Sequence, residues 1–346
     1  MAMPDEMALT DVLDVRGLNI SFHTRRGILP AVRDLSFRLG EGETLALVGE
    51  SGSGKSITSL GILRLTPPAP FCRIGGRVLL RDRNRSVHDL TALSEDGMRG
   101  LRGRVAAMIF QEPMTSLNPV HSIGDQISEA VRQHLGLGRR AALERAVELL
   151  DMVGIPAPRQ RLSAYPHQLS GGMRQRAMIA MALSCEPSLL IADEPTTALD
   201  VTIQAQILEL LRRLQEKTRM GVIFITHNLG VVAEIADRVM VMYAGRVVEQ
   251  ADVVPLFKTP RMPYTRGLLR SVPRLDLAGR RAGELAAIPG NVPDALYLPP
   301  GCAFAPRCDY ALSGVCDVAV PDLEAAGAGH FVRCARWHEL AREDAA

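Results

Sequence analysis

Hydrophobic and polar residues alternate over the first part of the chain. Between residues 12 and 48, Leu18, Ile20 and Phe22 take every second position, and the polar stretches "RRG" and "GEGE" interrupt the pattern. A period of two predicts strands with one buried face, and glycine-containing breaks predict tight turns. We therefore expect the fold to begin with short antiparallel strands.

A different pattern follows. The stretch "TLALVGESGSGKSITSLGILRL" changes from an apolar run to a glycine-rich run and then to helical spacing, which predicts strand, loop and helix. From about residue 95 to 186 most of the chain is predicted to be helical. In "GRRAALERAVELLDMVG" apolar residues recur three and four positions apart, and Gly154 and Pro156 end the pattern. We expect a helical subdomain over about 95–186.

Two later apolar segments, "SLLIADE" and "GVIFITH", predict strands on either side of the helix "VTIQAQILELLRRLQEKT". A strand, helix, strand crossover implies a parallel sheet. The stretch "VMVMYAGRVVEQ" predicts a hairpin, and "KTPRMPYTRGLL" with the proline-rich "IPGNVPDALYLPPGC" predicts a small irregular C-terminal extension. The expected fold class is α/β, with an antiparallel N-terminal subdomain and a parallel-sheet core.

Composition and charge narrow the function. The 346 residues are 47% hydrophobic, and 40 basic against 38 acidic residues leave a formal charge of +2, with no basic run typical of a nucleic-acid partner. The first residues lack the pattern of a signal peptide, and the apolar runs are shorter than the roughly 20 residues that span a bilayer. We expect a cytoplasmic protein that reaches a membrane only through another subunit.

The most informative loop is "GESGSGKS", which matches G-x-x-x-x-G-K-[ST] between a predicted strand and helix. Glycines allow backbone N–H groups to turn toward phosphate oxygens at a helix N-terminus, Lys55 can neutralise β and γ phosphates, and Ser56 can bind Mg²⁺. The alternative is a chance glycine turn. The candidate nucleotide-binding residues are Gly49, Glu50, Ser51, Gly52, Ser53, Gly54, Lys55, Ser56 and Ile57.

A pair of acids ends the strand "LLIADEP". In a parallel α/β sheet the end of such a strand lies beside the phosphate loop. Asp193 would then hold Mg²⁺, directly or through water, and Glu194 would activate the water that attacks the γ-phosphate. Two acids after a strand can also be a simple solvated strand end, and the phosphate loop favours the nucleotide role.

The stretch "LSGGMRQRAMIAMAL", from Leu169, resembles the signature sequence of ABC ATPases and stands about twenty residues before "LLIADE". Ser170 can cap a helix whose first turn contains Gly171 and Gly172, and a glycine pair before a helix also occurs at ordinary caps. The resemblance implies an ABC-type P-loop ATPase with a RecA-like core. It also implies that the signature faces ATP bound by a second ATPase subunit in a head-to-tail dimer.

Other residues match that family in the expected order. Gln111 in "MIFQEP" resembles the Q-loop glutamine, which touches Mg²⁺ or the attacking water and senses the membrane partner. Asp200 ending "TTALD" resembles the D-loop, and His227 resembles the switch histidine that contacts the γ-phosphate. Phe22 could stack on adenine, although strand alternation alone explains an apolar residue there. The resemblance implies that ATP and Mg²⁺ are bound and that Glu194, His227 and Gln111 act in hydrolysis.

Longer stretches of sequence indicate which branch of the ABC ATPase family the chain resembles. "LALVGESGSGKS", "MIFQEPMTSLNPV", "YPHQLSGGMRQRAMIAMAL", "YAGRVVEQ" and "PYTRGLL" resemble the peptide and nickel branch of ABC importer ATPases. The resemblance implies an ATPase domain at 8–255, an extension at 256–346 and the cytoplasmic face of the membrane as location. It implies two permease subunits, docked near "SLNPV", and an extracytoplasmic solute-binding protein. Alternatives are a nickel-chelate, glutathione or sugar substrate, or a soluble ABC ATPase with a ribosomal or nucleic-acid partner.

The end of the chain gathers four of its six cysteines in the spacing C-x5-C-x7-C-x17-C, at Cys302, Cys308, Cys316 and Cys334. Thiolates on a short, proline-broken segment can enclose a metal centre. Some relatives of this branch hold a four-iron, four-sulfur cluster with such a tail, so the resemblance implies a [4Fe-4S] cluster. Zinc, with His330 or His338 in place of one thiol, and no metal at all remain as alternatives.

Overall fold

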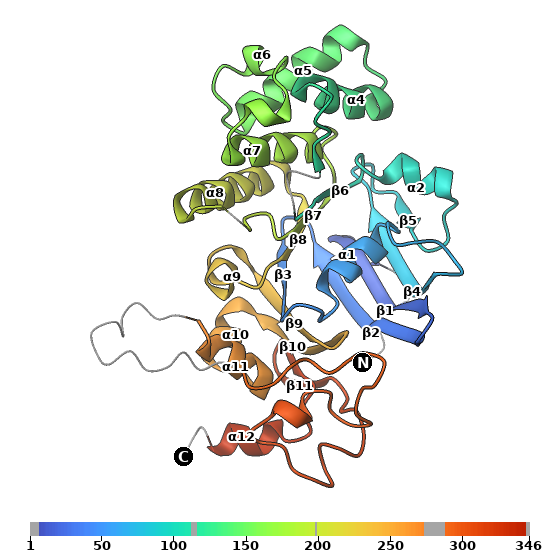
Figure 1. The fold of residues 1–346 in the computed structure, drawn as a ribbon, viewed down its shortest axis with the longest axis vertical. Coiled ribbons are helices and arrows are strands. Elements are labelled where there is room, and N and C mark those ends of the chain that lie inside the picture. The colour runs from blue at the N-terminus through green and yellow to red at the C-terminus, as the bar shows by residue number, and fades with distance from the viewer. Residues whose placement is uncertain (1–6, 112–115, 198, 273–287, 344–346) are drawn as a thin grey trace, which may run out of the picture.

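The computed structural model describes residues 7–111, 116–197, 199–272 and 288–343. An antiparallel sheet opens the fold, as the alternating pattern predicts, and it lies beside the core sheet in Figure 1. Within the described residues its strand order is β2-β1-β4-β5. The strands are β1 (Asp11–Thr24), β2 (Gly27–Gly40), β4 (Cys72–Arg81) and β5 (Val87–Asp89).

A second, larger sheet forms the core. Over the described ranges its order is β11-β12-β10-β9-β3-β8-β7-β6, and the strands from β9 to β6 run parallel. The parallel crossover and the hairpin of β9 with β10 are therefore confirmed. The strands are β3 (Thr44–Val48), β6 (Ala106–Ile109), β7 (Leu189–Asp193), β8 (Gly221–Ile225), β9 (Arg238–Tyr243), β10 (Arg246–Asp252), β11 (Glu324–Gly327) and β12 (His330–Val332).

Helices gather at one end of the core sheet, at the top of Figure 1. They are α4 (Ile123–Leu135), α5 (Arg139–Met152), α6 (Pro158–Arg161), the 3-10 turn η1 (Pro166–Gln168) and α7 (Gly171–Ala182). The helix α2 (Glu95–Leu101) lies apart from them, beside the antiparallel sheet. The prediction of a helical segment misses β6, which pairs with β7 in the core sheet. Its four residues, Ala-Ala-Met-Ile, are too few for periodicity to separate strand from helix.

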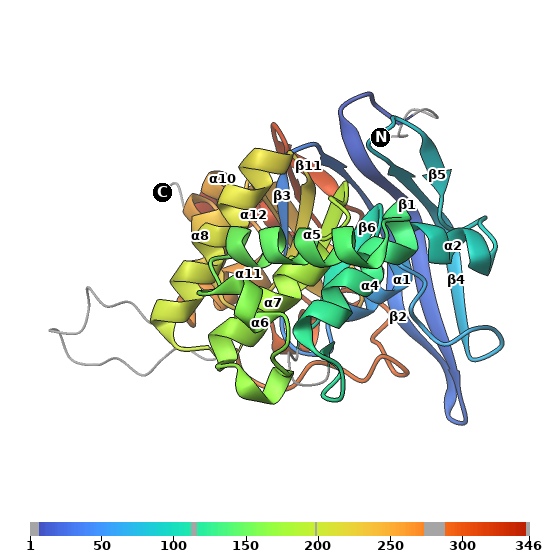
Figure 2. The same ribbon diagram turned by 90° about the horizontal axis from the view of Figure 1, so that it is seen from above.

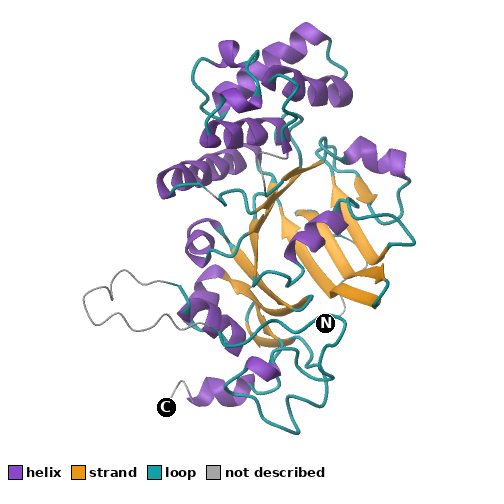
Figure 3. Cartoon of the chain, viewed as in Figure 1, coloured by secondary structure: helices purple, strands orange, loops and turns teal. Residues whose placement is uncertain are grey.

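The remaining helices lie beside the core sheet or within the C-terminal region. Figure 2 shows them from above, and Figure 3 shows them by element type. Among the described residues no helix is both long and apolar enough to cross a membrane. These elements are α1 (Lys55–Ile62), α8 (Val201–Thr218), α9 (Leu229–Ile235), α10 (Val253–Lys258), α11 (Pro263–Arg270), the 3-10 turn η3 (Ala305–Arg307) and α12 (Trp337–Glu343).

Two contacts join neighbouring parts of the fold: helix α1 packs on β1, and strand β12 of the C-terminal region pairs with β10. A Cβ on Gly61 of α1 would lie 2.2 Å from Cδ1 of Ile20, so the lack of a side chain lets this helix pack closely on β1 with Ile20 in its present position. At the other edge, β12 pairs antiparallel with β10, and Glu249 is opposite Val332. The extension thus holds more regular structure than its composition predicts, and it continues the core sheet. The division at residue 255 remains a prediction.

Candidate functional site

The phosphate loop runs from β3 to α1 in a conformation that two glycines make possible. Gly49 has φ +148° and Gly54 has φ +103°, values that side chains rarely permit. A Cβ on Gly49 would lie 2.3 Å from the carbonyl oxygen of Met242, and one on Gly54 would lie 2.6 Å from that of Ala31. The loop therefore turns tightly against β9 and β2 and ends at the N-terminus of α1, where backbone N–H groups are free to bind an anion.

Lys55 lies inside this loop. Its ammonium donates to the carbonyl oxygens of Gly49 at 2.8 Å and Glu50 at 2.9 Å. Burial lowers the pKa of Lys55, and the carboxylates of Glu194 and Asp193 act against that shift. The ammonium also donates to the Ser53 hydroxyl at 3.5 Å, so its hydrogen bonds in the structure go to neutral groups. A buried cation in this setting is suited to an incoming phosphate.

Asp193, at the end of β7, accepts a hydrogen bond from the Ser56 hydroxyl at 3.1 Å. The Asp193 residue is buried, and burial raises the pKa of its carboxyl by more than the Ser56 hydrogen bond lowers it. A hydroxyl and a carboxylate are the hard oxygen donors that Mg²⁺ prefers. A cation here would stabilise the ionised carboxylate, so the residues present fit a magnesium site.

Glu194 brings three further side chains together. One carboxylate oxygen accepts from the Gln111 amide at 3.0 Å and from the Thr197 hydroxyl at 2.9 Å, and the other lies 3.1 Å from Nδ1 of His227. Because a carboxylate only accepts, this contact places the proton on Nδ1 of His227. Burial would raise the pKa of Glu194, but the hydrogen bonds of His227 and Thr197 outweigh it and the pKa lies below its ordinary value.

The residues of the predicted signature occupy a separate place. Ser170 caps α7 by accepting the N–H of Met173 at 3.3 Å, and Asp200 caps α8 by accepting the N–H of Ile203 at 2.9 Å. Within the part of the chain that the structure describes, neither cap hydrogen-bonds to the phosphate loop or to Glu194. A Cβ on Gly171 would meet no atom within 4 Å, whereas one on Gly172 would lie 3.0 Å from Ile203. The N-terminus of α7 is therefore open at Gly171.

Two other predicted residues, Phe22 and Ile57, pack in the hydrophobic interior. Phe22 is a half-buried residue of β1, opposite Leu29 on β2 and Cys72 on β4. Ile57 in α1 is also half-buried, and both pack against the hydrophobic cluster that joins the two sheets. Packing accounts for both side chains, and adenine stacking by Phe22 stays a prediction.

Sequence reasoning missed several residues that contact the site. Thr197 lies in "TTALD", a stretch from which the family resemblance predicts a role for Asp200 alone. Tyr264 accepts the backbone N–H of Glu50 at 2.8 Å, and Arg307 donates to the Glu50 carboxylate at 2.7 and 3.0 Å. Their strings, "PYTRGLL" and "GCAFAPRC", are visible in the sequence, but nothing in the pattern connects them with the phosphate loop.

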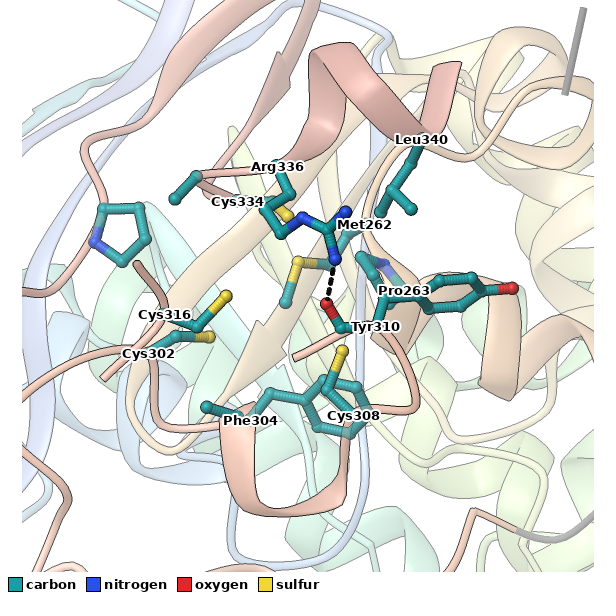
Figure 4. Close-up of a pocket in the computed structure, with 13 residues that line it drawn as sticks. Met262, Pro263, Cys302, Phe304, Cys308, Tyr310, Cys316, Cys334, Arg336 and Leu340 are labelled. Carbon is teal, nitrogen blue, oxygen red and sulfur yellow. Dashed lines mark hydrogen bonds between the residues drawn. The ribbon is translucent and has the colours of Figure 1, made fainter. Parts of the chain in front are cut away.

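The four C-terminal cysteines line one cavity (Figure 4), together with Met262, Phe304 and Leu340 among others. The backbone N–H of Cys302 donates to the carbonyl of Cys316 at 2.8 Å, which joins the two segments that carry them. Burial raises the pKa of the Cys302, Cys308 and Cys334 thiols. Across the described ranges, however, no three metal-binding side chains lie close enough together to hold a metal ion.

The two histidines considered as zinc ligands do not line this cavity. His330 is buried and its Nε2 lies 2.7 Å from the carboxylate of Glu249, which is also buried. His338 stacks on Trp337 with ring centroids 3.6 Å apart. The pairing of β12 with β10 explains why His330 turns to Glu249 and away from the thiols.

Comparison with known families and proteins gives matches along most of the chain. Residues 32–197 match the ABC transporter family, and residues 248–316 match the oligopeptide/dipeptide transporter C-terminal region. A peptide import ATP-binding protein of Brucella melitensis is 57% identical over 97% of this chain and 100% of its own length. The dipeptide transport ATP-binding protein DppD of Bacillus subtilis is 53% identical over 93% of this chain and 94% of its own.

Solved structures agree with this fold. The dimeric ATP-binding cassette MJ0796 in a state bound to ADP and phosphate has a TM-score of 0.60 at 26% identity, over 70% of this chain and 98% of its own. CbiO1 of Clostridium perfringens, from the CbiONQ ABC transporter complex, has a TM-score of 0.60 at 28% identity. The match covers 72% of this chain and 92% of CbiO1. The chain thus belongs to the ABC transporter family, among the ATP-binding proteins that carry the oligopeptide/dipeptide transporter C-terminal region.

Proposed function

We propose that this chain hydrolyses ATP to ADP and phosphate to drive the uptake of dipeptides or oligopeptides across the cytoplasmic membrane. The observation that carries the proposal is the geometry around Glu194, a carboxylate held by Gln111, Thr197 and His227 next to the hydrogen-bonded pair of Ser56 and buried Asp193. The names of the relatives, which are peptide import and dipeptide transport ATP-binding proteins, support peptides as the solute.

Each part of the site has a defined task in this reaction. The loop N–H groups and Lys55 bind the β and γ phosphates, and Ser56 and Asp193 hold Mg²⁺. Bound Mg²⁺ neutralises charge on the phosphate oxygens. Glu194 accepts the proton of the attacking water, and its low pKa keeps it ionised at neutral pH. Gln111 and His227 orient that carboxylate, and in this proposal they would also contact the attacking water and the γ-phosphate.

A second ATPase subunit, identical or homologous, completes the site in this proposal. The open N-terminus of α7, with Ser170, Gly171 and Gly172, would face the γ-phosphate bound by the partner, and Asp200 would lie at the same interface. A helix N-terminus favours an anion through its free N–H groups and dipole. The dimeric state of the neighbour MJ0796 supports this arrangement.

An apolar cavity next to Gln111 supports docking of a membrane partner. Its volume is about 360 Å³, and it lies between β6 and α7, lined by Met108, Ile109, Phe110, Ser116, Met178 and Met181. Phe110, which lines the cavity, is 42% exposed, and Val120, further along in "SLNPV", is 74% exposed, so both residues offer apolar surface to a partner. We place helices of two permease subunits here, with an extracytoplasmic solute-binding protein delivering the peptide. The chain would then lie peripherally on the cytoplasmic face of the membrane.

The cysteine cavity is the site that we assign to a [4Fe-4S] cluster in this proposal, with zinc or no metal as the alternatives. Among the described side chains no three metal-binding groups lie close enough together to hold a metal ion. The support for the proposal is therefore the four-cysteine spacing and the largely apolar cavity that Cys302, Cys308, Cys316 and Cys334 line together. In this proposal the four thiolates hold the cluster, which fastens the C-terminal segments together.

Purification of the full complex tests the proposed function. The tagged chain is isolated from native membranes in mild detergent, its companions are identified, and its ATPase rate is measured with candidate peptides and the solute-binding protein. We expect two permeases in the complex and hydrolysis that rises with peptide. Recovery with ribosomes or nucleic acid, and no membrane subunits, would contradict the proposal.

Anaerobic purification of the same complex tests the metal. Iron, sulfide and zinc are measured alongside the visible absorption spectrum, for the natural chain and for Cys308→Ser with Cys185→Ser as the control. We expect about four irons and four sulfides per chain, lost in Cys308→Ser but kept in the control. A folded, active chain without iron would refute the proposed cluster. One zinc ion per chain would show that the cysteines bind zinc instead.

A further inference from the structure

Among the described residues, the hydrogen bonds from beyond position 255 to the phosphate loop all meet at Glu50. Tyr264 of α11 accepts its backbone N–H at 2.8 Å, and Arg307 of η3 binds both oxygens of its carboxylate at 2.7 and 3.0 Å. The carbonyl of Glu50 accepts from Lys55. All the hydrogen-bonding groups of this residue are therefore engaged, two of them by residues beyond position 255.

Arg307 is itself fixed in a built pocket. Its side chain is 5% exposed, and it also donates to the carbonyl of Pro289 at 2.8 Å and to the Tyr243 hydroxyl at 3.2 Å. The guanidinium lies 5.9 Å from the centre of the Tyr243 ring and 6.0 Å from that of Phe304. Bidentate geometry and stacking on aromatic faces are features that lysine cannot reproduce.

This pocket adjoins the cysteine cavity. Phe304 lines that cavity, and it packs against Tyr243 and Tyr264 with ring centroids 5.3 Å apart in each case. Arg307 directly precedes Cys308, and its backbone N–H donates to the carbonyl of Phe304 at 2.9 Å. The segment that carries the thiols is thus the segment that binds the phosphate loop.

We propose that Arg307 and Tyr264 are positioning residues of the ATP site, which hold the phosphate loop in its binding shape and neutralise the Glu50 carboxylate. This inference rests on the proposed ATPase function and extends the nucleotide site into the C-terminal region. The hydrogen bonds from Tyr264 and Arg307 hold the loop in place before ATP arrives. Less conformational entropy is then lost when ATP binds.

The charge of Glu50 makes the proposal specific. Its carboxylate lies near enough to Lys55 to influence the pKa of the ammonium. Without Arg307, that carboxylate would be free to turn to Lys55 and would repel the phosphates of ATP. Loss of Arg307 should therefore weaken ATP binding, and removal of the charge on Glu50 should restore much of it. A purely structural role for Arg307 gives no such rescue.

The test uses the full chain with Mg²⁺ and compares Arg307→Met, the double variant Arg307→Met with Glu50→Gln, and Arg333→Met. Arg333 is a matched control, because it is a partly buried arginine of the same region that binds the carbonyls of Val247 and Pro321 and has no contact with the loop. The readouts are the equilibrium Kd for ATP, KM and kcat of hydrolysis, and the thermal midpoint.

We expect Arg307→Met to raise the Kd and KM for ATP about 10-fold, the effect of about one charge-assisted hydrogen bond, with kcat within about twofold. The double variant should return to within about threefold of the natural chain, and the control should not change. Equal ATP affinity in Arg307→Met and Arg333→Met, or no rescue by Glu50→Gln, would overturn the proposal.

Tyr264→Phe gives an independent test if Arg307→Met fails to fold. It removes one oxygen, preserves the ring packing and leaves the Glu50 N–H without its acceptor. We expect a rise of about threefold in the Kd for ATP, and an unchanged Kd would count against the positioning role. If the natural chain does not bind ATP at all, the proposed function fails and the positioning role fails with it.

Discussion

Replacement of Glu194 by glutamine is the most direct perturbation of the proposed chemistry. The change removes one charge and one acceptor oxygen but preserves the shape of the side chain. The partners can adapt, because the Gln111 amide can flip to present its oxygen and the Thr197 hydroxyl can rotate to accept. The free energy of unfolding should therefore fall by no more than about 1 kcal/mol.

The effect on hydrolysis should be far larger. A positioned general base contributes about 10²- to 10⁴-fold to the rate, which corresponds to roughly 3 to 5 kcal/mol of activation free energy. Glu194→Gln should lower kcat by that factor. The Kd for ATP should stay within about threefold, because the phosphate-loop contacts of Lys55 with Gly49 and Glu50 remain.

Phosphate release under single-turnover conditions measures the chemical step, and equilibrium binding of ATP measures the affinity. Glu209→Gln is the matched control, because Glu209 is an exposed acid of α8 that pairs with Arg212. Hydrolysis by Glu194→Gln at more than about a tenth of the natural rate would refute the assignment of Glu194 as the base. Loss of ATP binding with the control intact would show that Glu194 serves binding instead.

Three further predictions concern other parts of the site. Thr197→Val removes a donor that lowers the pKa of Glu194 against the effect of burial, so the acidic limb of the kcat profile should move to higher pH; an unmoved limb would exclude this coupling. Gly49→Ala forces a Cβ to within 2.3 Å of the Met242 carbonyl oxygen, so the thermal midpoint should fall by several degrees and ATP binding should be lost; a natural midpoint would show that the loop can relax. Phe22→Ala should raise the KM for ATP about 5- to 100-fold if the ring stacks on adenine, whereas an unchanged KM would leave Phe22 with packing alone.

The sequence predicted the fold wherever the signal was local. The phosphate loop is recognisable because Gly49, Gly54 and Lys55 are close in sequence and each has its own physical reason. Strand β6 escaped prediction because its four residues carry no period of their own and pair with a strand some 80 positions later. The pairing of β12 with β10 was equally hidden, since His330 meets Glu249 only through the folded sheet.

The site divides in the same way. Gln111, Glu194 and His227 were predicted from short motifs, and the structure brings them together. Arg307 and Tyr264 could not be assigned to the phosphate loop, because a contact across the sheet leaves no periodic or compositional trace near either residue. The cysteines show the intermediate case, because their clustering in sequence agrees with the one cavity that all four line, while a metal in that cavity stays a prediction.

The central claim is that ATP hydrolysis at Glu194 drives peptide uptake. Its most direct test is the uptake of a labelled peptide into vesicles that contain the permeases and this chain, with the solute-binding protein on the side opposite to ATP. We predict uptake against a gradient with the natural chain and with Glu209→Gln, and none with Glu194→Gln although that variant binds ATP. Uptake at the natural rate by Glu194→Gln, or ATP hydrolysis by the natural chain without any peptide movement, would contradict the account.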